Sequence, residues 1–393
     1  MTKITDIPAI RFKGFSDTWE QRKLGDVVKE ITRNDPESEA PIMMITANNG
    51  FIEQSERYAF NNAGESLKKY ILLKKGELAY NHGASKLRPY GSCFALTTAE
   101  NARIPFVYHC FSAENQNAEF MSIELNGAEI ENQLRKIVSS GARMDGLLNI
   151  SFDEYTSVSV LLPCTEEQDR IAEFFRQLDR LITLHQRKYD KLTNVKKSML
   201  EKMFPQNGSN APEIRFKGFT EAWEQRKVRE VTDRYDNLRI PVAASLRVAG
   251  TTPYYGANGI QDYVDGYTHD GEFILVAEDG ANDLKNYPVK CVKGRIWVNN
   301  HAHVLQGKYD CADNQFLAYA ISQADIESLL VGGGRAKLNA ETLMGIDLLL
   351  PNKAEQIRIG KYLAQLDNLI TLHQRELEKL KNLKKACLEK MFV

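Results

Sequence analysis

The chain has 393 residues, 43% of them hydrophobic and 26% charged, a composition typical of folded proteins that excludes disorder over most of the length. This length favours two or three domains, and the lack of any run of ~20 apolar residues excludes a membrane-spanning helix. The net charge of −1 does not exclude a nucleic-acid partner, because a neutral sum can hide a basic face.

The first distinctive segment, Pro8–Val27, returns later in the chain as Pro212–Val231. The two copies share 13 of 20 residues at an offset of 204. Each copy carries three aromatic residues at the spacing of packing residues (Phe12, Phe15 and Trp19; Phe216, Phe219 and Trp223). We expect each copy to pack against the long helices described below and to lead into the first strand of the segment that follows it.

The segment that follows the first copy, residues 28–161, is called the first middle. Short β-type runs occur at 47–52, 70–80 and 91–98, and a helical run occurs at 122–138. We expect an α/β domain with a mostly β core.

Residues Leu162–Phe204 predict a long helix, and they recur as Leu350–Phe392 with 26 of 43 residues identical at an offset of 188. Pro163 stands at the entry, Thr165 is the expected N-cap, and Pro205 ends the run. Apolar residues at heptad spacing predict a seam, as in a coiled coil, and ~38 residues give a rod of ~57 Å. The predicted seam residues are Ile171, Leu178, Leu181, His185, Leu192, Ile359, Leu366, Leu369, His373 and Leu380.

An isolated rod of this kind needs a partner, and the other copy is the obvious one. Antiparallel pairing would make His185 and His373 neighbours at a pseudo-twofold axis. We interpret them as a polar pair that sets the register; a metal site, a pH switch or simple exposure are the alternatives. The basic runs Lys196–Lys197 and Lys384–Lys385 are interpreted as solvated faces, with a DNA or partner contact as the alternative.

Residues 232–349 form the second middle, which shows little identity with the first. Strand patterns cover 267–282 and 289–307, and a helix with Asp313 as its cap is expected over 313–333. The sequence thus predicts an α+β fold with a pseudo-twofold internal repeat: two mostly β domains joined by two long antiparallel coiled-coil helices. The expected boundaries are 1–161, 162–205, 206–349 and 350–393.

Loops in both middles are rich in planar polar, basic and aromatic side chains, which suit DNA bases and phosphates. Turn formation explains many of these residues equally well. The candidates in the first middle are Asn48, Asn49, Tyr80, Asn81, His82, Lys86, Arg88 and Arg143. Those in the second middle are Tyr254, Tyr255, Asn258, Asn282, Lys285, Asn299, Asn300, His301, Arg335 and Lys337.

Motifs of catalysis are missing from the sequence. There is no phosphate-binding loop, no nucleophile elbow and no nuclease carboxylate cluster. His301 and His303 have no evident third metal ligand. Six cysteines with no CxxC pair and an N-terminus without an apolar core favour a cytoplasmic protein with reduced thiols. Binding is therefore favoured over catalysis.

The alternation of repeated and variable segments resembles the specificity subunit of type I restriction-modification systems. The resemblance covers essentially the whole chain. It rests on the two LP…EQ…QLD-x-LITLHQR helices, on SGARMDGLLNIS and GGGRAKLNAET before them, and on the run from PYYGANG to WVNNHAHVL. These motifs are specific in combination and weak singly.

The resemblance implies two target recognition domains that each read one half of an asymmetric, bipartite DNA site, with the helices fixing the gap. It also implies two modification subunits, which would carry S-adenosylmethionine, and two restriction subunits, which would use ATP and Mg²⁺. This chain would bind no cofactor and catalyse no reaction. The alternative is a coiled-coil interaction scaffold without DNA specificity.

Overall fold

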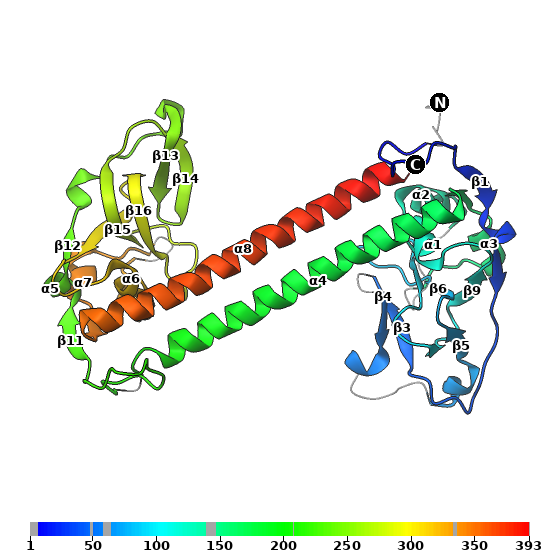
Figure 1. The fold of residues 1–393 in the computed structure, drawn as a ribbon, viewed down its shortest axis with the longest axis horizontal. Helices are drawn as coiled ribbons and strands as arrows, with labels where there is room; N and C mark the ends of the chain where they lie inside the picture. Colours follow the sequence, from blue (N-terminus) through cyan, green and yellow to red (C-terminus); the bar gives the residue numbers. More distant parts are fainter. Residues whose placement is uncertain are drawn as a thin grey trace. The chain divides into compact units, whose positions relative to one another are not determined.

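The computed structural model describes residues 7–47, 50–57, 64–138, 147–206, 208–332 and 336–392. The chain divides into two compact units, residues 1–184 with 377–393 and residues 185–376. Each unit holds one middle and a stretch of both long helices, α4 (Thr165–Lys202) and α8 (Lys353–Met391) (Figure 1). The expected α+β class is confirmed. Within the described ranges, no helix has the length and hydropathy that a membrane span requires.

The first unit is built on a four-stranded antiparallel sheet in the order β2-β9-β6-β7. Its strands are β2 (Val28–Glu30), β6 (Leu78–Asn81), β7 (Ser92–Ala95) and β9 (His109–Ala113). Strand pairs β3 (Met43–Thr46) with β4 (Gly50–Glu53), and β5 (Ile71–Lys74) with β8 (Asn101–Ile104), add a second layer around Leu73, Leu96 and Ile104.

Three α-helices follow in this unit: α1 (Ala118–Glu124), α2 (Ala128–Ile137) and α3 (Phe152–Thr156). Short 3-10 turns lie at Leu24–Asp26, Gln54–Glu56 and Gly64–Lys69. The single helix expected over 122–138 was wrong, because the chain breaks at Gly127. That residue has extended dihedral angles and stands at the N-cap, directly before α2, as suits a residue with a low helix propensity.

The second unit contains a six-stranded sheet in the order β12-β17-β15-β16-β13-β14. The strands are β12 (Thr232–Arg234), β13 (Ala249–Gly256), β14 (Gly259–Val264), β15 (His269–Ala277), β16 (Val289–Val298) and β17 (Ala302–Gly307). All neighbours pair antiparallel except β13 and β16, which run parallel.

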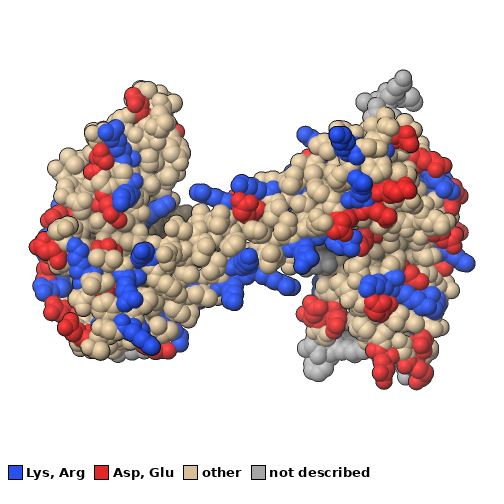
Figure 2. Space-filling view, in the orientation of Figure 1, with Lys and Arg blue, Asp and Glu red and all other residues tan. Residues whose placement is uncertain are grey.

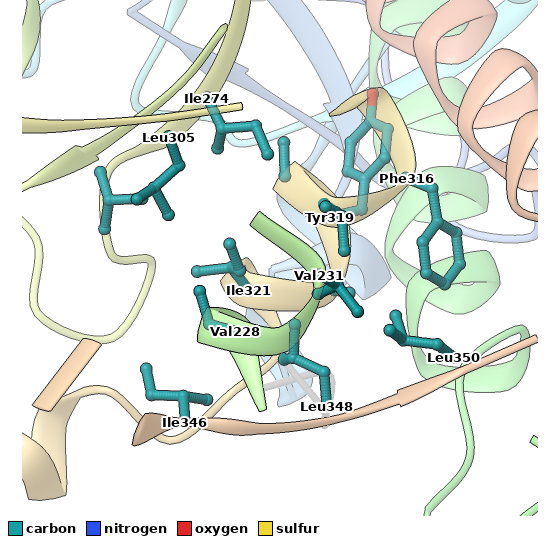
Figure 3. Close-up of a cluster of buried hydrophobic side chains, with 14 of the residues drawn as sticks. Val228, Val231, Ile274, Leu305, Phe316, Tyr319, Ile321, Ile346, Leu348 and Leu350 are labelled. Carbon is teal, nitrogen blue, oxygen red and sulfur yellow. The ribbon is translucent and has the colours of Figure 1, made fainter. Parts of the chain in front are cut away.

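The core of the second unit lies between this sheet and the helices α5 (Val228–Val231), α6 (Asn314–Ser322) and α7 (Ala340–Gly345). The remaining turns are at Asp236–Leu238, Ala244–Leu246 and Glu327–Leu329. Asp313 caps α6 as expected, since its side chain accepts from Phe316 N at 2.8 Å, although the helix ends at Ser322. Figure 3 shows Val228, Phe316, Ile321, Ile346 and Leu348 with Ile274 and Leu305 of the sheet in one cluster.

The repeated aromatic segments dock on the long helices by the same contacts in both units. Arg11 donates two hydrogen bonds of 2.7 Å to the fully buried Glu167 of α4, and Arg215 does the same to Glu355 of α8. Ile10 N donates to Lys390 O, and Ile214 N donates to Lys202 O, both at 2.9 Å. Each segment therefore joins the beginning of one long helix to the end of the other.

The last part of each repeated segment forms a short ribbon with the strand that precedes a long helix. Strand β1 (Glu20–Lys23) pairs antiparallel with β10 (Ser159–Leu162), and β11 (Glu224–Lys227) pairs with β18 (Asp347–Leu350). Trp19 and Trp223, which precede these strands, are 2% and 3% exposed. The repeated segments are followed directly by β2 and β12. The expectation that they pack against the helices and lead into the first strand of each middle is therefore confirmed.

The predicted helix seam is partly right. Ile171, Leu178, Ile359 and Leu366 are buried, but Leu181 and Leu369 are 42% and 43% exposed. The residues that turn inward are their neighbours Ile182 and Ile370. The two isoleucines continue a spacing of four and three residues: Ile171, Phe175, Leu178, Ile182, His185, Tyr189 and Leu192 on α4, and Ile359, Leu363, Leu366, Ile370, His373, Leu377 and Leu380 on α8. Two adjacent apolar residues left the choice of seam open in the sequence.

Ion pairs and the histidine pair fix the antiparallel register inside each unit. In the second unit Lys196 Nζ lies 2.6 Å from Asp367, and the equivalent Lys384 lies 2.5 Å from Asp179 in the first. His185 Nδ1 lies 3.2 Å from His373 Nδ1, both in the second unit. The two histidines are therefore neighbours on the seam, as antiparallel pairing requires.

Removing the charge of Arg11 tests the docking of the repeated segment. Arg11→Met leaves the Glu167 carboxylate buried without its partner and should cost about 3–5 kcal/mol of unfolding free energy. The double variant Arg11→Met with Glu167→Met should recover most of that loss. Urea denaturation measures both values, with Arg22→Met at a partly exposed ion pair as a control that changes stability by less than ~0.5 kcal/mol. A double variant no more stable than the single one would contradict the conclusion that Arg11 compensates the buried charge of Glu167.

Replacing the histidine pair tests its role in the seam. Burial, His185 and Lys188 hold the pKa of His373 below its ordinary value of 6.5. Folded protein thus binds fewer protons than unfolded protein, and stability should fall as the pH drops below about 6.5. His185→Leu with His373→Leu should remove this component, so that the stability of the variant falls less between pH 7 and pH 5. Thermal melts of the unaltered chain and of the double variant from pH 5 to 8 measure this change. Melting temperatures that depend on pH in the same way for both proteins would contradict the role of the histidine pair.

Candidate nucleic-acid interface

Both middles build the same loop junction at the end of a central strand. In the first unit Leu148 N donates to His82 O at 2.9 Å, and Gly83 forms a β-bridge with Leu147. In the second unit Leu338 N donates to Glu278 O at 2.7 Å, and Asp279 bridges Lys337. In sequence, Leu147 lies four residues after Arg143, and Lys337 lies two residues after Arg335. The candidates Arg143 and Arg335 lie outside the described residues.

In the second unit this junction gathers side chains from four separate segments. Asn258 Nδ2 donates to Gly280 O, and Asn258 Oδ1 accepts from Asn282 N, both at 2.9 Å. His301 Nδ1 lies 2.5 Å from Asp279 Oδ1. Lys337 Nζ lies 2.8 Å from Glu278 Oε1. The structure therefore brings together Asn258, Asn282, His301 and Lys337, which we call the second-unit loop cluster.

A buried charge network supports this cluster from below. His303, 1% exposed, contacts Asp236 Oδ2 at 2.7 Å through Nδ1 and Leu338 O at 2.9 Å through Nε2. Arg239 donates to Glu278 at 2.6 Å. Burial alone would raise the pKa values of Asp236 and Glu278, but their hydrogen bonds outweigh it and hold both pKa values below the ordinary range. The cluster is thus anchored by ionised groups that stay charged near neutral pH.

The candidate residues of the second unit divide by exposure. Asn258, Asn282, Lys285, Asn300, His301 and Lys337 are exposed and can meet a ligand. Tyr254, Tyr255 and Asn299 are 1%, 7% and 4% exposed, so we exclude them as direct contacts. Tyr254 supports the fold instead: its ring lies under the Arg247 guanidinium at 4.0 Å, and its hydroxyl accepts from Val242 N.

The first unit offers fewer exposed candidates. Tyr80 is 1% exposed, its ring stacks on Tyr155 at 3.9 Å between centroids, and its hydroxyl donates to Tyr90 O. His82 is 8% exposed, with its two ring nitrogens 2.8 Å and 2.7 Å from backbone carbonyl oxygens. Both are core residues, and the expectation of direct contact is corrected for both. A single sequence does not show which residues of a loop-rich segment are buried.

The other first-unit candidates stay near the junction. Asn81 is partly buried, accepts from Gly83 N at 2.9 Å and donates to Ile45 O, so it shapes the turn. Arg88 is partly buried and donates to Asn126 O at 2.8 Å. Lys86 is exposed. Asn48 and Asn49 lie outside the described residues.

Sequence reasoning missed the acidic residues Asp236, Glu278 and Asp279. In the structure these carboxylates orient His301, His303 and Lys337. The sequence feature that could have indicated them is the acidic pair Glu278–Asp279 directly after an apolar strand. Among the described residues, no group of three or more His, Cys, Asp or Glu side chains is arranged to hold a metal ion.

The sequence is similar to a known protein family and to several of its members. The pattern of the family described as "Type I restriction modification DNA specificity domain" matches residues 16–194 and 220–382. A Haemophilus influenzae protein described provisionally as a type I restriction enzyme specificity subunit is 44% identical over 146 residues, 37% of this chain and 38% of that one. The MjaVIII specificity subunit of Methanocaldococcus jannaschii is 23% identical over 280 residues, 63% of this chain and 64% of its own. The matches thus span less than two thirds of these relatives.

Among solved structures, the type I restriction-modification S subunit from M. genitalium is similar with a TM-score of 0.66. The two share 13% sequence identity over 98% of this chain and 99% of that one. At this identity the likeness shows a shared fold, and it extends to both units and both long helices.

Proposed function

Because the chain belongs to the family of type I restriction modification DNA specificity domains, we propose that it selects the DNA sequence on which a restriction-modification complex acts. Each middle reads one half of an asymmetric, bipartite site. The observation that carries this proposal is the pair of equivalent loop junctions with different side chains: His82 and Gly83 in one unit, Glu278 and Asp279 in the other.

Exposed side chains in and beside the second-unit loop cluster suit direct readout. The amide of Asn300 can pair with an adenine edge, and the amines of Lys285 and Lys337 can contact phosphates. Over the face shown in Figure 2, Lys and Arg are interspersed with Asp and Glu on both units. On this face, lysines and arginines of separate loops would then supply the phosphate contacts that any such protein needs.

We assign the chemistry to partner subunits. Two modification subunits would bring S-adenosylmethionine and methylate adenine after flipping the base from the duplex. Two restriction subunits would bring ATP and Mg²⁺. This chain would bind no cofactor, would act in the cytoplasm where the DNA is, and would set the gap between the half-sites through α4 and α8.

Variants of the loop cluster test this function. In the complex with a modification subunit, His301→Ala and Lys337→Ala should each weaken binding by about 1–3 kcal/mol, and Lys337→Ala should lower the salt slope by about one. The DNA duplex carries the sequence that the complex methylates in cells, identified by sequencing the methylated DNA. Fluorescence anisotropy with this duplex at several salt concentrations measures both effects. Lys293→Ala, at an exposed lysine of the same unit outside the cluster, is the matched control.

The same variants test the division of labour between the units. Against duplexes with one half-site changed, the second-unit variants should lose discrimination at a single half-site and keep it at the other. Equal loss at both half-sites would contradict separate readers. Binding that does not respond to salt would favour a protein-interaction scaffold.

A further inference from the structure

An open groove of about 790 Å³ lies in the first unit between α1, α2 and the adjoining stretches of α4 and α8. Its floor is apolar, formed by Phe94, Ile123, Ile130, Phe175, Leu388 and Phe392. All of these residues belong to the same compact unit.

The second unit shows what occupies the equivalent position there. Helices α1 and α6 correspond, because Asn117 and Asp313 each cap their helix and each donate a backbone N–H to the equivalent Gln168 or Gln356 of a long helix. Counting from these caps, Tyr319 and Ala320 of α6 stand where α1 has Ile123 and Glu124.

Tyr319 closes the second unit against its long helices. Its hydroxyl donates to Asp367 Oδ2 at 2.5 Å, and Lys196 lies over its ring at 5.6 Å while pairing with the same aspartate at 2.6 Å. The first unit keeps the equivalent pair of Lys384 and Asp179 at 2.5 Å. Ile123 has no hydroxyl to reach that pair, so the corresponding space remains open.

The open groove carries an acidic group at its wall. Glu124 is partly buried and accepts from Leu161 N at 3.1 Å, and burial raises its pKa to about 7, with Glu129 adding to the shift. Two other acids of the lining have cationic partners: Glu119 lies 3.4 Å from Arg176, and Asp179 pairs with Lys384. No cation is paired with Glu124 among the described residues. A cation placed beside this acid would favour its ionised form. An acid above an apolar floor therefore matches a cationic side chain flanked by apolar ones.

We propose that this groove receives a lysine or arginine, flanked by large apolar side chains, from a helix of the modification subunit that docks on the first unit. The inference rests on the proposed function and deepens it. The second unit fills the equivalent space with its own Tyr319, so the two modification subunits bind at inequivalent sites. Only the subunit at the first unit depends on Glu124.

A variant that copies the second unit tests the groove. Ile123→Tyr with Glu124→Ala should close the space and lower the affinity for one modification subunit by about tenfold or more, leaving the other unchanged. Glu124→Gln, which keeps the volume and removes the charge, should weaken the same single site. Glu114→Gln, at an exposed residue of the first unit outside the groove, is the matched control. Titration calorimetry of the purified chain with the modification subunit, together with native mass spectrometry, gives affinity and stoichiometry.

The outcomes separate the groove from the proposed function. In one outcome, both Glu124 variants bind two modification subunits with unchanged affinity and melt near the temperature of the unaltered chain. That result would overturn the proposal that the groove is a docking site. Equal loss at both sites would overturn the inequivalence. An unaltered chain that binds no modification subunit at all would contradict the proposed function itself.

Discussion

Two buried arginine–glutamate pairs determine how the rest of this protein is arranged. Arg11 with Glu167 and Arg215 with Glu355 each make two parallel hydrogen bonds at 2.7 Å, and both glutamates are fully buried. A buried carboxylate is strongly unfavourable without its partner. Each pair therefore commits a repeated segment to one place, the beginning of one long helix. The backbone bonds Ile10 to Lys390 and Ile214 to Lys202 then join it to the end of the other helix.

This constraint explains why the repeats are constant and the middles vary. The docked segments, the ribbons and the helix seam form a closed set of contacts that recurs in both units. The middles are inserted between a ribbon strand that leaves the frame and one that returns, so their loops can change without disturbing it. The equivalent junctions at His82 and at Glu278 carry different side chains for this reason, and so do the equivalent positions Ile123 and Tyr319.

The sequence predicted the parts that depend on periodicity and repetition. The internal repeat, both long helices, the Asp313 cap and the contact of His185 with His373 all follow from spacing. The choice between Leu181 and Ile182 did not, because either residue satisfies an apolar pattern and only packing selects one. Tyr80 and Tyr254 were wrongly predicted to contact DNA, because a tyrosine in a sequence can equally be an exposed loop residue or a buried core residue. The supporting acids Asp236 and Glu278 were missed because their value depends on partners distant in sequence.

The most direct test of this account is to make the two readers identical. Residues 232–346 are replaced with residues 28–158, so that both repeated frames carry the first middle, and the DNA methylated by the resulting complex is sequenced. The account predicts a folded chain and a split site whose two halves carry the same sequence in inverted order. Methylation of the original asymmetric site, or of a site with two different halves, would contradict the claim that each middle reads its own half-site.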